Sequence, residues 1–134
     1  MAARYTLSAG ERLKREQHIK ALFRSGKALS AFPLRLIWLL VPKNDEASVT
    51  RAGFSAPKKK FKHATDRNRI KRVMREVWRL QKLILEPVIP EGMQLHIFLL
   101  FIDVTLPDYD TVFAAAGKAI AQLKKTLDHA QPPE

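Results

Sequence analysis

The side chains best suited to chemistry lie on one face of a helix predicted to begin near residue 65. Asn68, Arg72, Arg75 and Arg79 follow one another at steps of i, i+4, i+7 and i+11, so on a helix they form one row. Arginine contacts phosphates through two parallel hydrogen bonds and also stacks on bases. The acidic partners that an ordinary exposed face carries at i, i+4 are almost absent. The row therefore indicates contact with nucleic acid.

Further cations surround this row. Lys71 and Lys82 flank it on one side and Arg69 on the other, while Arg67 lies near the apolar boundary of the helix. The chain of 134 residues carries a formal charge of +11, and residues 51–82 alone hold 12 basic and 2 acidic side chains. So many like charges repel one another unless a polyanion lies against them. Nucleic acid or an anionic membrane surface is the partner that this distribution favours.

Groups that could catalyse a reaction are few. The chain has no cysteine and no glycine-rich phosphate loop, and the basic segment holds only two carboxylates, Asp66 and Glu76. A two-metal nuclease needs a cluster of carboxylates. The histidines show no metal-ligand spacing, and we interpret each as a surface or structural residue: His18, His63, His96 and His129. We expect no catalytic residue and no metal site in this chain.

The apolar segments are too short to cross a membrane. The longest runs are residues 36–41 and 97–102, six residues each, whereas a membrane span needs about 20. No apolar signal segment follows Met1, and the absence of cysteine agrees with a reducing compartment. We expect a cytoplasmic protein without membrane contact.

Apolar periodicity predicts the elements that must position these residues. A first amphipathic helix covers about residues 11–25 and is ended by Gly26. Apolar residues 34–41 and residues 48–55, joined by the polar residues 43–46, indicate two antiparallel strands in a hairpin. Residues 29–32 form a further short strand in this interpretation.

The second half of the chain completes the pattern. Thr65 or Asp66 can cap the long helix, and Pro87 and Pro90 stop it. Its inner stripe consists of Ile70, Val73, Met74, Val77, Leu80 and Ile84. Residues 93–104 are apolar almost throughout, which indicates a central strand buried on both faces, and a last helix covers about residues 109–127.

These elements predict the α+β class. The arrangement is a small single-domain two-layer α/β sandwich with the order α-β-β-β-α-β-α. We expect one RNA-binding domain over residues 1–134, with an ordered core of about 11–128 and short flexible ends.

Aromatic side chains provide a second route to nucleic acid, because unpaired bases stack on them. Phe23 and Ile19 on the first helix, Trp38 on the hairpin and Phe54 beside the polybasic loop are candidates to line a groove floored by strands. For each of them a place in the core is the alternative.

Three motifs together resemble the signature of the protein subunit of bacterial ribonuclease P. They are Gly-Phe-Ser-Ala-Pro-Lys-Lys at residues 53–59, Arg-Asn-Arg-Ile-Lys-Arg at residues 67–72, and Arg75-Glu76. Arg12-Leu13-Lys14, followed by Phe23 and Gly26, is similar to that family's N-terminal helix. The resemblance covers about residues 11–128.

The resemblance implies a fold with a left-handed crossover around the Arg-Asn-Arg helix. It also implies that this helix and the loop before it face a catalytic RNA, through Lys58, Lys59, Arg67, Asn68, Arg69, Lys71, Arg72 and Arg75. The single-stranded 5′ leader of precursor tRNA would bind in a cleft between the first helix and the sheet, at Phe23, Ile19 and one of Ile37 or Trp38. Many members have an aromatic residue where this chain has Ile19, so stacking there should be weaker.

The function that the resemblance implies is that of the protein component of ribonuclease P. It would assist the catalytic RNA in endonucleolytic removal of the 5′ leader, with Mg²⁺ bound mainly by the RNA subunit. The alternative is a non-catalytic basic RNA-binding protein of the ribosome or its assembly. A nuclease made of protein alone is a third class, and the lack of a carboxylate cluster argues against it.

Overall fold

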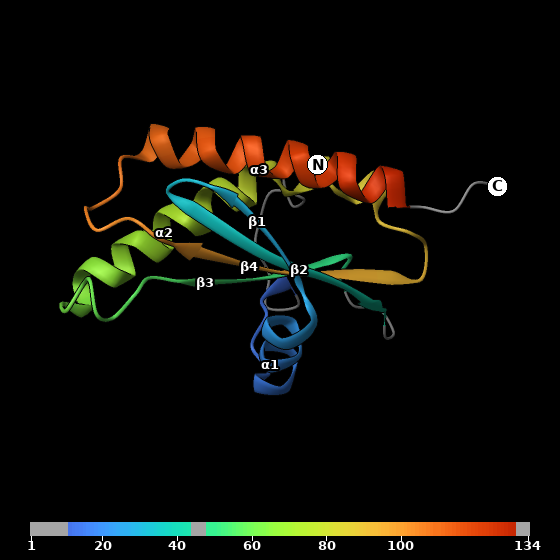
Figure 1. Ribbon diagram of the computed structural model, residues 1–134, viewed down its shortest axis with the longest axis horizontal. Helices are drawn as coiled ribbons and strands as arrows, with labels where there is room; N and C mark the ends of the chain where they lie inside the picture. Colours follow the sequence, from blue (N-terminus) through green and yellow to red (C-terminus); the bar gives the residue numbers. More distant parts are fainter. Residues whose placement is uncertain (1–10, 44–47, 131–134) are drawn as a thin grey trace.

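Four strands form one mixed sheet in the order β1-β2-β4-β3 in the computed structural model, which describes residues 11–43 and 48–130 (Figure 1). The strands are β1 (Lys27–Ala31), β2 (Leu34–Pro42), β3 (Thr50–Ser55) and β4 (Met93–Phe101). The helices are α1 (Glu16–Ser25), α2 (Ala64–Gln81) and α3 (Tyr109–Ala130), and two short 3₁₀ turns follow α2: η3 (Lys82–Ile84) and η4 (Glu86–Val88). The predicted α+β class and element order are confirmed.

β4 lies in the middle of the sheet and is largely buried on both faces, one of them wholly apolar and the other carrying Gln94 and His96 besides Phe98 and Leu100. It runs antiparallel to β2, with Ile97 opposite Trp38, and parallel to β3, with Ile97 opposite Ala52. The central position predicted for residues 93–104 is confirmed, although the strand ends at Phe101.

β2 and β3 do not form the predicted hairpin. β4 lies between them, so the two strands run in opposite directions without pairing. The prediction was wrong because a polar loop indicates that the chain turns but does not specify that the strands on either side become neighbours. Much of that loop, residues 44–47, lies outside the described residues. β1 does pair with β2, antiparallel, so the further short strand predicted at residues 29–32 is confirmed.

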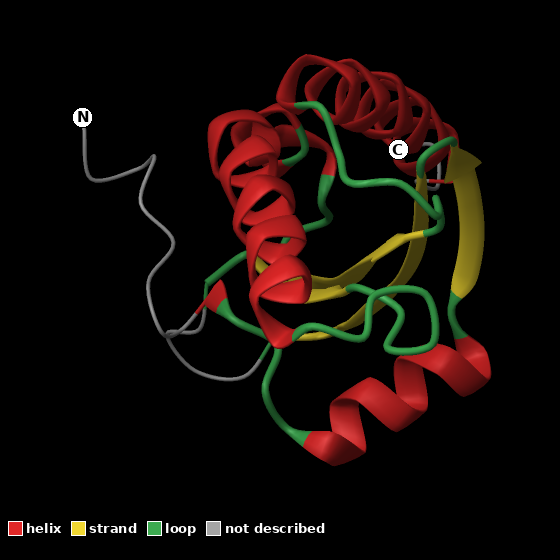
Figure 2. Ribbon diagram, turned by 90° about the vertical axis from the view of Figure 1, so that its left-hand side faces the viewer, coloured by secondary structure: helices red, strands yellow, loops and turns green. Residues whose placement is uncertain are grey.

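α2 and α3 cover one face of the sheet, and α1 lies against the other face (Figures 1 and 2). The main core fills the space between the sheet and the α2–α3 layer. Its largest members are fully buried: Trp78 of α2, Leu36 of β2, and Ile97 and Phe101 of β4. The sheet is thus a platform with a thick apolar layer on one side and a single short helix on the other.

The inner stripe of α2 is shorter than predicted. Leu80 and Ile84 are 38% and 45% exposed. Ile84 leaves the stripe because α2 ends at Gln81 and the chain continues in 3₁₀ turns, which shift the side chains that follow. Leu80 still belongs to α2 but lies at the margin of the stripe. Neither Thr65 nor Asp66 caps the helix, which begins after His63. Its buried side chains include Ile70, Met74, Val77 and Trp78.

The β3–α2–β4 connection joins two adjacent parallel strands. It is the crossover for which the family resemblance implies a left hand, whereas such connections are right-handed in nearly all proteins. The hand of this crossover stays a prediction. For the site, what matters is the connection itself. Because α2 follows the edge strand β3 along the chain, the cations of α2 lie beside that edge of the sheet.

Candidate nucleic-acid interface

α2 presents its cations to solvent because its opposite side is anchored in the core. Asn68, Arg69 and Arg72 are exposed, and Lys71 and Arg75 are half-buried. The loop before the helix adds Lys58 and Lys59, both exposed. The structure therefore places these seven of the eight residues predicted to face a catalytic RNA at the surface, on α2 and the loop that leads into it.

Arg67, the eighth of these residues, is also engaged within the fold. Its Nη1 donates hydrogen bonds to the carbonyl oxygens of Phe61, at 2.7 Å, and Lys62, at 3.0 Å. The ring of Phe61 is buried against Phe101, with 5.9 Å between ring centroids. Arg67 therefore fixes the polybasic loop to the first turn of α2.

The far end of the predicted row is partly neutralised. Arg79 donates hydrogen bonds to both carboxylate oxygens of Glu76, and the bond from Nε is 3.2 Å long. These hydrogen bonds favour the charged form of each partner, so the pKa of Glu76 is lowered and the pKa of Arg79 is raised. The positive charge of the row is therefore concentrated between Asn68 and Arg75.

A hollow of about 230 Å³ lies between α2, β3 and the segment that precedes α1. The guanidinium carbon of Arg75 lies 5.8 Å from the ring centroid of Phe54, a cation–π contact on one wall. Among the described residues that line this hollow there is no carboxylate; its cations are Arg12, Lys14, Lys71 and Arg75. Four cations around an aromatic wall suit a phosphate backbone with an adjacent base.

The segment before α1 is not helical as predicted. α1 begins at Glu16, and Arg12 instead pairs with Ala52 of β3 in a parallel bridge. The Leu13 amide donates a 2.9 Å hydrogen bond to the Ala52 carbonyl, and the Leu13 side chain is buried. β3 is an edge strand whose outer backbone groups need partners, and the segment supplies one. This pairing brings Arg12 and Lys14 to the α2 side of the molecule.

Lys82 is not an exposed member of the basic row. Its side chain is 1% exposed and forms an ion pair with Glu11, at the start of the same segment. The sequence placed Lys82 on the flank of a helix, but α2 ends one residue earlier and the chain turns inward there. The ion pair fastens the N-terminal segment to the end of α2.

Removing the carboxylate of this pair is expected to destabilise the fold. Glu11→Gln leaves the buried Lys82 ammonium facing an uncharged amide, so the free energy of unfolding should fall by about 3 kcal/mol in chemical denaturation. The double variant Glu11→Gln with Lys82→Met removes both charges and should recover most of that loss. If Glu11→Gln is as stable as the parent, the pair does not fasten the segment.

A second surface lies between α1 and the other face of the sheet. Phe23 of α1 is 45% exposed and packs its ring edgewise on Phe98 of β4, with 5.2 Å between centroids. Ile37 of β2 lies against the end of α1. A Cβ atom added to Gly26, the residue after this helix, would be only 2.9 Å from the Ile37 Cγ2. Ile19, one turn before Phe23, is half-buried. We refer to this surface as the α1 groove.

Trp38 does not line the α1 groove. It is 7% exposed and belongs to the core on the opposite face, where the Lys27 Nζ lies 5.5 Å from its ring centroid. The prediction that Trp38 lines the cleft was wrong, and of the two β2 candidates only Ile37 faces α1. β2 is apolar on both faces, so its sequence does not indicate which side faces outward. Phe54, the other aromatic candidate, also lies away from the groove, beside Arg75.

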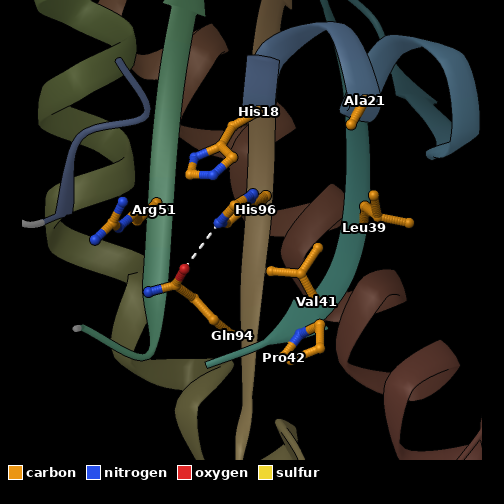
Figure 3. A pocket seen from close by; sticks show the side chains of 8 residues that line it. All are labelled: His18, Ala21, Leu39, Val41, Pro42, Arg51, Gln94 and His96. Atoms are coloured by element: carbon orange, nitrogen blue, oxygen red, sulfur yellow. Dashed lines mark hydrogen bonds between the residues drawn. The ribbon is translucent and has the colours of Figure 1, made fainter. Parts of the chain in front are cut away.

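Two histidines, both interpreted from the sequence as surface or structural residues, meet between α1 and the sheet, on the same face as Phe23 and Phe98 (Figure 3). The rings of His18, from α1, and His96, from β4, lie 5.1 Å apart between centroids. They line a pocket of about 280 Å³ together with Arg51 of β3 and Gln94 of β4. The sequence holds one indication that His96 faces α1. His96 and Phe98 are two residues apart on a strand, so their side chains lie on the same face of the sheet.

The pKa of His96 is lowered to about 4, chiefly because burial disfavours its charged form, with smaller contributions from His18 and Arg51. In the unfolded chain the imidazole takes up a proton near pH 6.5. The stability that its neutral form contributes is therefore complete above pH 6.5 and is lost as the pH falls towards 4.

This shift predicts a pH dependence of unfolding. Between pH 6.5 and 5 the His96 contribution should lower the free energy of unfolding with a slope of up to about 1.4 kcal/mol per pH unit. Denaturation at each pH should show that slope in the parent and a smaller slope in His96→Leu. Identical slopes in the two proteins would contradict the buried, neutral state of His96.

The described residues contain neither a metal-binding cluster nor a helix that could span a membrane. No group of three or more histidine and acidic side chains there is placed to hold a metal ion. In the same part of the chain, no helix combines the length and apolar character that a membrane span requires.

Comparison with known proteins identifies the family. A family model described as Ribonuclease P matches residues 7–127. The ribonuclease P protein component of Porphyromonas gingivalis is 36% identical over 123 residues, which cover 90% of this chain and 88% of that protein. The protein component of Chlorobium phaeobacteroides is 36% identical over 89 residues, covering 65% of this chain and 61% of its own length.

Solved structures show the same fold. The RNase P protein of Staphylococcus aureus superimposes with a TM-score of 0.66 at 18% identity, covering 85% of this chain and 95% of that one. The RNase P protein of Thermotoga maritima gives a TM-score of 0.59 at 22% identity, covering 91% and 99%. With the sequence matches over most of its length, the chain belongs to the ribonuclease P protein family.

Proposed function

We propose that this protein assists a catalytic RNA in removing the 5′ leader from precursor tRNA. In this proposal α2 and its preceding loop bind the catalytic RNA, and the α1 groove binds the single-stranded leader. The protein binds and positions the two RNAs, while hydrolysis occurs in the RNA subunit, which holds most of the Mg²⁺. The cysteine-free composition, which suits a reducing compartment, supports the cytoplasm as its location.

The observation that carries the proposal is that both surfaces border the same short strand. Gly53 and Phe54 of β3 line the cationic hollow beside α2. A Cβ atom on Gly53 would lie 2.6 Å from the Phe98 ring, against which Phe23 packs in the α1 groove. An RNA backbone on the cationic side and an unpaired strand in the groove would therefore be held next to each other.

This arrangement gives the protein an electrostatic and positional role. The cations neutralise phosphates where two RNAs approach, which otherwise repel each other strongly. The groove lets an exposed aromatic ring stack on an unpaired base of the leader. Holding substrate and catalyst in a fixed relative position lowers the entropic part of the activation barrier.

The test is cleavage of a 5′-labelled precursor tRNA at low Mg²⁺ concentration. Three reactions are compared: the cognate catalytic RNA alone, the protein alone, and the two together. Efficient leader release only by the mixture is expected. Cleavage by the protein alone would show a nuclease in its own right. No enhancement by the protein would favour the alternative role in ribosomal RNA binding.

A further inference from the structure

Residues 11–15, which we call the N-terminal strap, lie against the outer edge of β3 and are held there at Leu13 and at Glu11. The Leu13 amide is hydrogen-bonded to the Ala52 carbonyl, and the Leu13 side chain is buried. Glu11, at the start of the strap, forms its ion pair with Lys82, just beyond the end of α2. The strap therefore joins the edge of the sheet to the helix that carries the cationic surface.

The strap supplies two of the four cations that line the hollow beside α2 in the described part of the chain. Arg12 and Lys14 come from the strap, and Lys71 and Arg75 come from α2. Arg12 and Lys14 are exposed on either side of the buried Leu13, as in an extended segment whose successive side chains point in opposite directions. The geometry of this cationic site thus depends on two segments that are far apart in sequence.

A shift of the strap by one residue would disrupt that geometry. In an extended segment such a shift exchanges the two faces, so a cation would point into the protein and Leu13 into solvent. The ion pair opposes the shift, because moving Glu11 leaves the Lys82 ammonium, whose side chain is 1% exposed, without this carboxylate. The pair therefore specifies the register of the strap on β3.

The two charges of the pair are otherwise poorly suited to this surface. Lys82 is buried, so its ammonium is withdrawn from any RNA phosphate, and Glu11 brings a negative charge to a surface that faces a polyanion. Buried ion pairs also add little stability relative to apolar side chains of similar volume, whereas some of them fix the relative position of the groups that they join. A positional role accounts for both charges.

We propose that Glu11 and Lys82 are positioning residues for RNA binding. Their ion pair holds the strap in the one register in which Arg12 and Lys14 complete, with Lys71 and Arg75, a site for phosphates of the catalytic RNA. The inference rests on the proposed function and deepens it, because it makes the affinity of α2 for RNA depend on a segment outside the helix. Glu11 and Lys82 act through the strap cations.

The first test is the double variant Glu11→Gln with Lys82→Met, which removes the pair without changing the net charge. Its stability should be close to that of the parent, yet its affinity for the catalytic RNA should fall by about tenfold as two phosphate contacts are lost. The plot of log affinity against log salt should become less steep by up to about 2. Hydrogen exchange at the Leu13 amide should become faster, which reports the loosened strap directly.

The matched control is Glu16→Gln with Lys20→Met. These residues form an exposed ion pair of 3.1 Å on α1, and the double change again leaves the net charge unaltered. It should keep the parental affinity, salt dependence and Leu13 exchange. The single variant Glu11→Gln adds a further contrast: overall electrostatics alone predicts tighter RNA binding when an acidic group is removed, whereas the loosened strap predicts weaker binding.

Coupling between the pair and the strap cations separates positioning from a purely structural role. Arg12→Met with Lys14→Met should weaken RNA binding by about tenfold in the parent and cause little further loss in the variant without the pair. Leu13→Ala loosens the strap at its apolar anchor while leaving the pair in place. It should show the same coupling, and it guards against a fold defect in the variant that lacks the pair.

Four results would overturn the inference. They are unchanged Leu13 exchange without the pair, parental RNA affinity despite faster exchange, additive losses in the coupling experiment, and a loss confined to precursor tRNA, which would place the strap on the substrate side. In each case the parent protein still stimulates cleavage by the catalytic RNA, so the proposed function stands. Absence of that stimulation in the parent reaction would remove the proposed function and the inference together.

Discussion

Reversing two charges at the centre of the α2 row, Arg72→Glu with Arg75→Glu, is expected to weaken binding of the catalytic RNA by about a hundredfold. Each arginine is placed to make charge-assisted hydrogen bonds to phosphate, worth about 1.5–3 kcal/mol. Losing two phosphate contacts also releases fewer counterions, so the plot of log affinity against log salt should become less steep by about 2. Titration of labelled RNA at several salt concentrations measures both quantities.

The control for this variant carries the same change in net charge on another helix. Lys124→Glu with Lys125→Glu alters two exposed residues of α3, outside the proposed interface. It should reduce affinity only slightly. Because Arg75 contacts Phe54, circular dichroism should confirm that the α2 variant is folded. Equal losses in the two double variants would show that overall charge, and not the α2 row, determines binding.

Phe23→Ala is expected to weaken binding of leader-bearing precursor tRNA by about tenfold while leaving mature tRNA almost unaffected. The ring is 45% exposed although it packs on Phe98, so one edge is held by the protein and much of its surface is open to an unpaired base. Stacking of one base on an aromatic side chain contributes about 1–3 kcal/mol. Dissociation constants of the holoenzyme for the two RNAs give the comparison.

Phe32→Ala is the matched control. The Phe32 ring is 68% exposed, more than that of Phe23, and it lies at the turn between β1 and β2, beside α3. It should leave both affinities unchanged. If Phe23→Ala weakens both RNAs by the same factor, the ring acts through the packing of α1 on the sheet and does not contact the leader.

Much of the fold was predictable because strong patterns specify it. The nearly continuous apolar sequence of β4 indicates a strand with neighbours on both edges, and the 3.6-residue period of α2 indicates which side carries its cations. The hairpin prediction failed because pairing partners depend on which strand completes the sheet. That strand is β4, about 40 residues beyond β3 along the chain.

The cationic surface was predicted more accurately than the groove. Asn68, Arg69 and Arg72 are exposed on α2, whose geometry follows from local sequence. Trp38 and Lys82 were misplaced because β2 is apolar on both faces and because the end of α2 depends on tertiary contacts. The pairing of Arg12 with Ala52 and the meeting of His18 with His96 join segments far apart in sequence, so no local pattern reports them.

The late position of β4 in the chain sets an order on folding during synthesis. β1 and β2 can pair as soon as they leave the ribosome, but β3 has no partner strand in the described sheet except β4. The basic residues of α2 are therefore translated before the sheet edge that positions them exists. Contacts of such high sequence separation form slowly, because a long loop must close first. The nascent protein consequently acquires its RNA-binding geometry only when residues 93–101 have emerged from the ribosome. The cations of α2 are therefore synthesised some time before they form a defined surface.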